Sequence, residues 1–255
     1  MFCAMCAFLI RGDTLSWSDR VPPLSHDMKI QLPALAALLL LGAVPAPGAD
    51  TAPPSQAFDL HAWKLQVPGP IEVKDLRNYS SGYFFLNGSR EMCFSLDAAE
   101  QGTTPNTKYV RSELRHLPDW TLDGSHTLTG EVRVISHLQP DKLTVLQIHG
   151  ITPAGDNAPP LLRIAVENGD LYADVKGDAE GEKTDKVLLK PGVKSGYVKV
   201  AIIVKGHQLR VLVDGQEKLA RDLSYWKFSN YFKAGLYPQA TQGTAQVFFR
   251  KLKAE

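Results

Sequence analysis

Three short segments of this chain carry polar side chains that could act together in one site. Residues 111–115 (Arg-Ser-Glu-Leu-Arg), 147–149 (Gln-Ile-His) and 231–239 (Tyr-Phe-Lys-Ala-Gly-Leu-Tyr-Pro-Gln) each alternate polar and apolar residues. Successive side chains of an extended strand point to opposite faces, so this alternation predicts strands with one polar face and one apolar face. If the three strands lie side by side in one sheet, their polar faces merge into a single site.

The polar face of the longest segment suits a charged, ring-shaped ligand. It carries Tyr231, Lys233, Gly235, Tyr237 and Gln239. Two phenols, an ammonium group and an amide on either side of a glycine gap are typical of the floor of a groove that holds a polar, anionic ligand. The other two segments add Arg111, Glu113 and Arg115, and Gln147 and His149.

The elements that must position these residues are short strands. Gly, Asn and Asp turns separate the predicted strands, and no window shows sustained helical spacing of apolar residues. The strands are expected at 63–67, 83–86, 91–96, 128–135, 142–148, 161–166, 171–175, 197–204, 208–213, 216–219 and 245–252. The pattern predicts an all-β fold, an antiparallel two-sheet β-jelly-roll sandwich with a concave substrate groove. The loop 152–160 is predicted to border that groove as a flap.

Composition excludes some classes of function. The 255-residue chain is 44% hydrophobic, enough for one sizeable core, and its net charge is +1. Near-neutrality argues against a nucleic-acid partner recognised by bulk charge, but leaves open a local basic groove for a polyanion. We expect Cys93, in an apolar run, to be a buried core thiol.

The N-terminal region reads as an export signal. Met28 and Lys29 precede an apolar run that ends at Pro45 and small residues, which is typical of a signal peptide and too short to span a membrane. We predict an over-extended start at 1–27, a signal peptide at 28–49, a linker at 50–57 and one domain at 58–255. The mature protein is expected to be secreted or periplasmic, monomeric and free of membrane.

Taken together, the three segments resemble the motifs of polysaccharide lyase family 7, the alginate lyases, and the likeness runs from about Phe58 to the C-terminus. The resemblance implies a jelly roll that binds alginate, a polymer of mannuronate and guluronate. Matched residue by residue, it implies that Arg111, Gln147, His149 and Tyr237 are catalytic. It further implies that Glu113, Arg115, Tyr231, Lys233 and Gln239 support substrate binding. Pro238 departs from the family pattern, which most often has Asn there, and its missing N–H puts the local strand pairing in question.

The chemistry of these residue types agrees with that implication. Breaking the 4-O-glycosidic bond of a uronate by β-elimination removes the C5 proton, so the adjacent carboxylate must be neutralised. Arg111 and Gln147 offer donors for it, with Glu113 orienting Arg111 or Arg115. Tyr237 suits the acid that protonates the leaving oxygen. The base is His149 or Tyr237: mannuronate has proton and leaving group on one side, whereas guluronate needs a base opposite Tyr237.

Two other classes of function are compatible with a β-sandwich of this kind. A glycoside hydrolase would need two carboxylates across the bond, and a carbohydrate-binding module would need only aromatic platforms. The histidines show no metal-ligand spacing, so we predict neither a metal nor a cofactor. Within the resembling family, Ile at the position of Ile148 accompanies activity on guluronate, which predicts a preference for guluronate-containing or mixed blocks.

Overall fold

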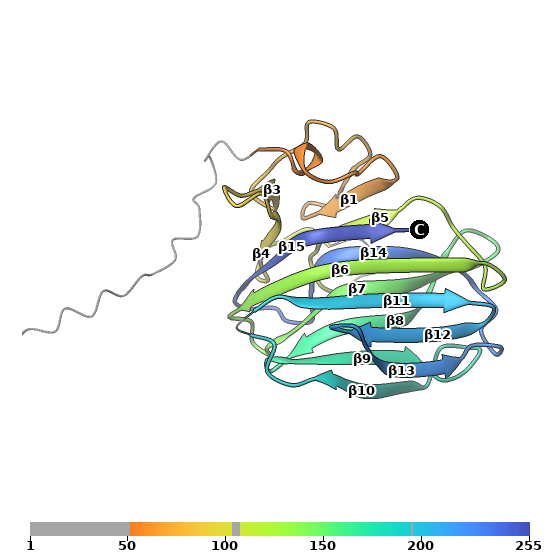
Figure 1. Ribbon diagram of the computed structural model, residues 1–255. Coiled ribbons are helices and arrows are strands. Elements are labelled where there is room, and N and C mark those ends of the chain that lie inside the picture. Colours follow the sequence, from red (N-terminus) through yellow and green to blue (C-terminus); the bar gives the residue numbers. More distant parts are fainter. Residues whose placement is uncertain (1–51, 104–107, 195) are drawn as a thin grey trace, which may run out of the picture. The chain divides into compact units, whose positions relative to one another are not determined.

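The computed structural model describes residues 52–103, 108–194 and 196–255, which fold as two antiparallel β-sheets (Figure 1). A single 3-10 turn, η1 (Pro54–Gln56), is the only helical element among these residues. None of the helical segments in the described part of the chain could cross a membrane. The expected all-β, two-sheet jelly-roll sandwich is confirmed.

The first sheet has eight strands in the order β10-β9-β8-β7-β14-β5-β1-β2. Their bounds are β1 (Trp63–Val67), β2 (Ile71–Val73), β5 (Ser112–His116), β7 (Lys142–Ile151), β8 (Asn157–Glu167), β9 (Asp170–Lys176), β10 (Thr184–Lys190) and β14 (Ser229–Pro238). The three polar segments therefore meet at the centre of this sheet, since β14 pairs with β7 on one side and with β5 on the other.

The second sheet has seven strands in the order β13-β12-β11-β6-β15-β4-β3. Their bounds are β3 (Phe84–Leu86), β4 (Met92–Asp97), β6 (Ser125–Ser136), β11 (Val198–Lys205), β12 (Gln208–Val213), β13 (Gln216–Asp222) and β15 (Thr244–Ala254). Figure 1 shows β6, β11 and β15 in front of the strands of the first sheet.

One hydrophobic core fills the space between the sheets. The apolar faces of the central strands supply it, with Phe232, Ile148 and Leu114 from the first sheet and Phe94 and Phe249 from the second, all almost completely buried. Burial of such side chains is worth about 1.5–3 kcal/mol each. This shared core fixes which face of β5, β7 and β14 is left for polar residues.

A glycine lets two strands of the site approach closely. Gly235 has a φ of 145°, and a Cβ there would lie 2.6 Å from the Ser112 carbonyl oxygen and 2.8 Å from the Glu113 Cα. The glycine gap foreseen on the polar face thus brings β14 against β5, because no other residue leaves room for this contact.

Two strands and part of a third were absent from the prediction. β2 and β10 lie at the two edges of the first sheet, where exposed polar residues interrupt the expected alternation. β8 begins at Asn157, so the flap predicted at 152–160 is wrong in length: residues 157–160 extend the strand despite two prolines. The loop between β7 and β8 is only 152–156.

The residues that precede the domain contact it. The predicted linker 50–57 is described from Ala52, whose carbonyl oxygen accepts a hydrogen bond from the Leu86 N–H at 2.8 Å, and Pro54 is buried. The expected over-extended start at 1–27 and signal peptide at 28–49 lie outside the described residues. Cys93 is fully buried, as expected of a core thiol, and burial raises its pKa to about 12.

Candidate active site

A groove of about 670 Å³ lies over the face of the first sheet that points away from the core. Six of the predicted site residues line it: Arg111, Gln147, His149, Tyr231, Lys233 and Tyr237. Strand pairing brings them together, since Lys233 lies opposite Gln147 and Tyr231 lies opposite His149. The three segments do merge their polar faces, as the alternation predicts.

Glu113 lies beneath this floor and joins its cations and amide. Its carboxylate forms an ion pair with the Lys233 ammonium, accepts a hydrogen bond from the Gln147 amide, and lies 3.5 Å from the Arg111 guanidinium. Glu113, Lys233 and Gln147 are each at most 2% exposed. We refer to Glu113, Lys233, Gln147 and Arg111 as the Glu113 cluster.

Charge balance keeps this cluster ionised. Burial raises the pKa of the Glu113 carboxyl, but the charges of Lys233 and Arg111 outweigh burial, so the pKa lies below its usual value. Burial lowers the pKa of Lys233 to about 8, against the opposing effect of Glu113. A buried pair of this kind costs about 3–5 kcal/mol to break, because one charge is then left uncompensated.

The Gln147 amide has a fixed orientation. A carboxylate only accepts hydrogen bonds, so the Gln147 Nε2 must face Glu113. Its Oε1 is buried and has no hydrogen-bond partner among the described residues. Gln147 therefore has one N–H and one carbonyl oxygen left for a ligand in the groove.

Tyr237 lies between two guanidinium groups. The Arg111 Cζ is 4.4 Å from the centre of its ring and the Arg163 Cζ is 6.0 Å away. Burial raises the pKa of the Tyr237 phenol, and the two arginines lower it less than burial raises it. No partner for the hydroxyl occurs within the described residues, so a neutral phenol with a free proton faces the groove.

His149 differs from Tyr237 in that it can accept a proton. Its Nδ1 lies 3.0 Å from the Gly150 carbonyl oxygen, which only accepts, so Nδ1 carries the proton and Nε2 has a free lone pair. Burial, with the charge of Lys233 adding to it, lowers the pKa of His149 to about 4. The imidazole is therefore neutral at pH 7 and can accept a proton.

Tyr231 holds the imidazole in place. The two rings stack at 5.2 Å with an interplanar angle of 19°, and the Arg115 guanidinium covers the other side of Tyr231 at 4.0 Å. Burial raises the pKa of Tyr231 to about 12, so its hydroxyl stays protonated; it donates to Asn157 Oδ1 at 3.3 Å.

Besides Glu113, which lies beneath the floor, two of the expected substrate contacts do not line the groove. Arg115 pairs with Asp119 at 2.7 Å rather than with Glu113, so the carboxylate of Glu113 is available to Arg111 alone of the two arginines. Gln239 donates from its Nε2 to the Tyr237 carbonyl oxygen at 2.6 Å, and its Oε1 accepts from the Thr144 hydroxyl at 3.3 Å. Both residues support Tyr231 or Tyr237 from outside the groove.

Pro238 does not interrupt the sheet. It is the last residue of β14 and still pairs with Leu143, and the next N–H, from Gln239, donates to the Lys142 carbonyl oxygen at 2.9 Å. A shift of register between Ala234 and Tyr237 precedes it. The missing donor falls where the ladder ends, which explains why a proline is tolerated there.

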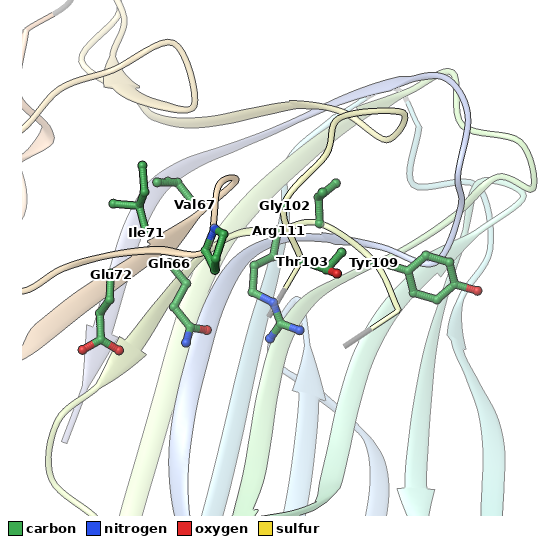
Figure 2. A pocket seen from close by; sticks show the side chains of 10 residues that line it. Gln66, Val67, Ile71, Glu72, Gly102, Thr103, Tyr109 and Arg111 are labelled. Carbon is green, nitrogen blue, oxygen red and sulfur yellow. The ribbon is translucent and has the colours of Figure 1, made fainter. Parts of the chain in front are cut away.

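A smaller pocket of about 130 Å³ adjoins the groove on the β1–β2 side (Figure 2). It shares Gln66 and Arg111 with the groove, and Figure 2 shows Gln66 between Glu72 and Arg111. Glu72 forms an ion pair with Lys64 at 2.7 Å. Gln66 also accepts a hydrogen bond from the Lys233 ammonium at 3.4 Å, which connects this pocket to the Glu113 cluster.

Two residues that line the groove, Gln66 of β1 and Arg163 of β8, were not predicted from the sequence. In β8, Arg163 is a single polar residue among prolines and leucines, which gives a weak pattern. Arg163 lies opposite Gln147 in the β7–β8 pairing, so alternation along 161–166 could have marked it as facing the same way. No group of three or more His, Cys, Asp or Glu suited to a metal ion occurs in the described part of the chain.

Comparison with known proteins agrees with this geometry. The alginate lyase family, described as "Alginate lyase", matches residues 58–255. An alginate lyase of Photobacterium sp. is 28% identical over 236 residues, which cover 76% of this chain and 83% of that protein.

Solved structures point the same way. Alginate lyase A1-II′, a member of polysaccharide lyase family 7, has a TM-score of 0.75 and 29% identity, covering 79% of this chain and 97% of its own. A variant of that enzyme, solved with a substrate written GGMG, has a TM-score of 0.75 and 28% identity, covering 83% and 97%. The chain belongs to the alginate lyase family, polysaccharide lyase family 7, and is a polysaccharide lyase.

Proposed function

We propose that this enzyme depolymerises alginate by metal-free β-elimination at the 4-O-glycosidic bond, leaving an unsaturated uronate at the new non-reducing end. The observation that carries the proposal is the pairing of two proton-transfer groups of opposite character, neutral His149 and protonated Tyr237, above the Glu113 cluster.

The cluster supplies the first requirement of this reaction. Removing the C5 proton sends negative charge into the uronate carboxylate, and preorganised donors stabilise developing charge without reorganising. Arg111 offers a guanidinium and Gln147 offers one remaining N–H. Glu113 holds both donors in place from below, and its ion pair with Lys233 keeps the buried carboxylate charged.

Proton transfer is the second requirement. The free Nε2 of His149 takes the C5 proton of guluronate, and the Tyr237 hydroxyl protonates the leaving oxygen. In mannuronate, where proton and leaving group lie on one side of the ring, the Tyr237 phenol gives its proton to the leaving oxygen while its oxygen takes the C5 proton, so it is neutral before and after the step. General acid or base catalysis of this kind contributes about 10²–10⁴-fold to the rate.

Glycoside hydrolysis is disfavoured by the charge pattern of the groove. A hydrolase needs two carboxylates that face each other across the bond. Among the described lining residues only Asp156 has a carboxylate, and Glu113 below is committed to Lys233.

We propose a preference for guluronate-containing or mixed blocks. Ile148 is fully buried between Gln147 and His149 on the core side of β7, so its volume sets the height of both side chains. Displacements of about 1 Å can cost roughly a hundredfold in rate. Comparing initial rates on polyguluronate and polymannuronate tests this, and Ile148→Val should shift the ratio towards polymannuronate.

The decisive experiment follows ultraviolet absorbance of alginate incubated with the purified protein. Elimination creates a conjugated double bond that absorbs, whereas hydrolysis creates new reducing ends without absorbance. Chelator treatment should leave the rate unchanged; a loss of activity restored only by added metal would contradict the metal-free mechanism.

We further propose that the enzyme is exported and acts as a monomer outside the cytoplasm. The apolar run after Met28 supports export. N-terminal sequencing of exported protein should find a start between Pro47 and Asp50, and light scattering should find one chain per particle; an N-terminal Met28 or a stable dimer would refute the respective statement.

A further inference from the structure

The groove extends from β7 onto β8, and the next strand of the sheet, β9, carries a further cation on the same face. Arg163 lines the groove directly opposite Gln147 in the strand pairing. Lys176 follows on β9, two residues beyond Asp174, which pairs with Arg163. Alternation places Lys176 on the same face as Asp174 and Arg163.

Arg163 lacks, among the described residues, the acidic partner that most cations of this face possess. Its Nε is buried without a hydrogen-bond partner among the described residues, and no carboxylate there lies within 4 Å of its guanidinium. Asp174, the acid opposite, lies instead 3.7 Å from the Lys142 ammonium. Within the part of the chain that the structure describes, the recorded side-chain partner of Lys176 is neutral, the Thr184 hydroxyl at 2.9 Å.

The neighbouring cations are neutralised by acids. Lys233 pairs with Glu113, Arg115 pairs with Asp119, and Lys186 pairs with Glu167 at 2.5 Å. A half-buried guanidinium with an unsatisfied N–H costs free energy unless a ligand supplies an acceptor. Burial lowers the pKa of Lys176, and the charge of Arg163 lowers it further, against the opposing charges of Asp178 and Asp174.

We propose that Arg163 and Lys176 form a binding subsite for a uronate carboxylate next to the cleavage centre, on the β8–β9 side of the groove. The inference rests on the proposed function and extends it to how the enzyme holds long chains. Adjacent strands lie about 4.8 Å apart, so each step from β7 to β8 to β9 moves roughly the length of a sugar ring. Arginine suits this role because its planar fork matches a carboxylate.

The opposite end of the groove supports this assignment by contrast. On the β1–β2 side the adjoining pocket presents Glu72 together with the apolar side chains of Val67 and Ile71 (Figure 2). Among the described residues that line that pocket Arg111 is the one cation, and it already lies 3.5 Å from Glu113. Unpaired positive charge is therefore concentrated on the β8–β9 side.

The test compares steady-state kinetics of Arg163→Gln, Lys176→Gln and the wild type on alginate polymer and on oligomers of increasing length. The matched control is Lys186→Gln, which removes one positive charge from the same face where an acid already neutralises it. We expect KM for the polymer to rise about tenfold in Arg163→Gln and about threefold in Lys176→Gln, and to stay within twofold in the control. The rise should disappear with oligomers too short to reach β8.

Two further measurements separate binding from a structural role. Added salt should raise KM less steeply in both variants, because fewer cations remain to be screened. Arg163→Lys, which keeps the charge but loses the planar fork, should recover part of the affinity.

The outcomes are distinct. If the wild type forms no unsaturated product, the proposed function fails. If the wild type is active but KM on long chains is unchanged in Arg163→Gln and Lys176→Gln, or rises equally for every chain length, the subsite is refuted. Should Arg163→Gln melt at a much lower temperature than the wild type, Arg163→Lys and Lys176→Gln decide the question in the same assay.

Discussion

In two parts of this fold a glutamate is buried beside basic side chains, and only one of these parts lines a groove. The Glu113 cluster lies on the first sheet. On the second sheet Glu91, 6% exposed, accepts hydrogen bonds from Tyr197 and from Asn87 at 2.9 Å, and pairs with Arg250 at 3.3 Å and Arg133 at 3.6 Å. We call these five residues the Glu91 cluster.

The difference lies in what each cluster leaves unsatisfied. The Tyr197 hydroxyl donates a hydrogen bond to Glu91, and the Arg250 guanidinium lies 3.8 Å from the centre of the Tyr197 ring. The phenol and the cation therefore already have partners within the protein. Around Glu113, by contrast, the Gln147 Oε1 and the Arg163 Nε have no partner among the described residues. Residue types alone therefore do not make a site; a site also needs unsatisfied groups that face an open space.

The largest expected effect is that of Tyr237→Phe. Removing the hydroxyl removes the acid that both reactions need, so kcat on polyguluronate and polymannuronate should fall by about a thousandfold or more, within the range of general acid catalysis. Ultraviolet rate measurements on both polymers check this. A fully active Tyr237→Phe enzyme would remove the mechanism.

His149→Ala should divide the two substrates. We expect a loss of about a hundredfold on polyguluronate, whose base is His149, and less than tenfold on polymannuronate, where Tyr237 serves as base. Parallel assays on the two homopolymers measure the ratio. Equal residual activity on both would falsify the split roles.

Glu113→Gln and Glu91→Gln test the two clusters directly. Each substitution removes a buried carboxylate and leaves its cations without a counter-charge. In urea unfolding Glu113→Gln should destabilise the fold by about 3–5 kcal/mol, because Lys233 is buried, and Glu91→Gln by about 1.5–3 kcal/mol, because the side chains of Arg250 and Arg133 are partly exposed. Only Glu113→Gln should also lower kcat, by roughly tenfold or more, since it releases Gln147 and Lys233. Matching losses of activity in the two variants would erase the distinction between the clusters.

The pH profile sharpens the role of His149. Because burial lowers its pKa to about 4, the imidazole stays neutral, and able to accept a proton, down to that pH. The acid limb of kcat/KM on polyguluronate should therefore lie near pH 4, below which the rate falls about tenfold per unit. A limb near the ordinary histidine value of about 6.5 would contradict a buried neutral base.

The smallest effect on activity is expected for Tyr197→Phe. Deleting the hydroxyl that donates to Glu91 should cost about 1–2 kcal/mol of stability, the usual value for a hydrogen bond to a charged group, and leave kcat on both polymers unchanged. Thermal unfolding and the ultraviolet assay measure the two quantities. Any substantial loss of rate in the folded variant would argue that the second sheet takes part in catalysis.

Alternation along the chain was sufficient to predict which side chains share a face. Tyr231, Lys233 and Tyr237 lie on one side of β14, and Gln147 and His149 lie on one side of β7, because the two-residue period of a strand is fixed by its backbone. The same period, with turn residues between strands, predicted the two-sheet class. The edge strands β2 and β10 were not predicted because most of their residues are exposed, which leaves too few buried positions for a clear alternation.

Only the tertiary structure decided which residues meet across strands. Arg115 and Gln239 were expected in the groove, but Arg115 pairs with Asp119 and Gln239 bonds to the Tyr237 backbone. Arg163 was not expected there, but it lines the groove. Their partners come from strands or loops whose lateral order is set by how the core packs, and local sequence does not encode that order. The same packing buried Glu113 and Lys233, and burial is what gave His149 and Tyr237 their opposite protonation states.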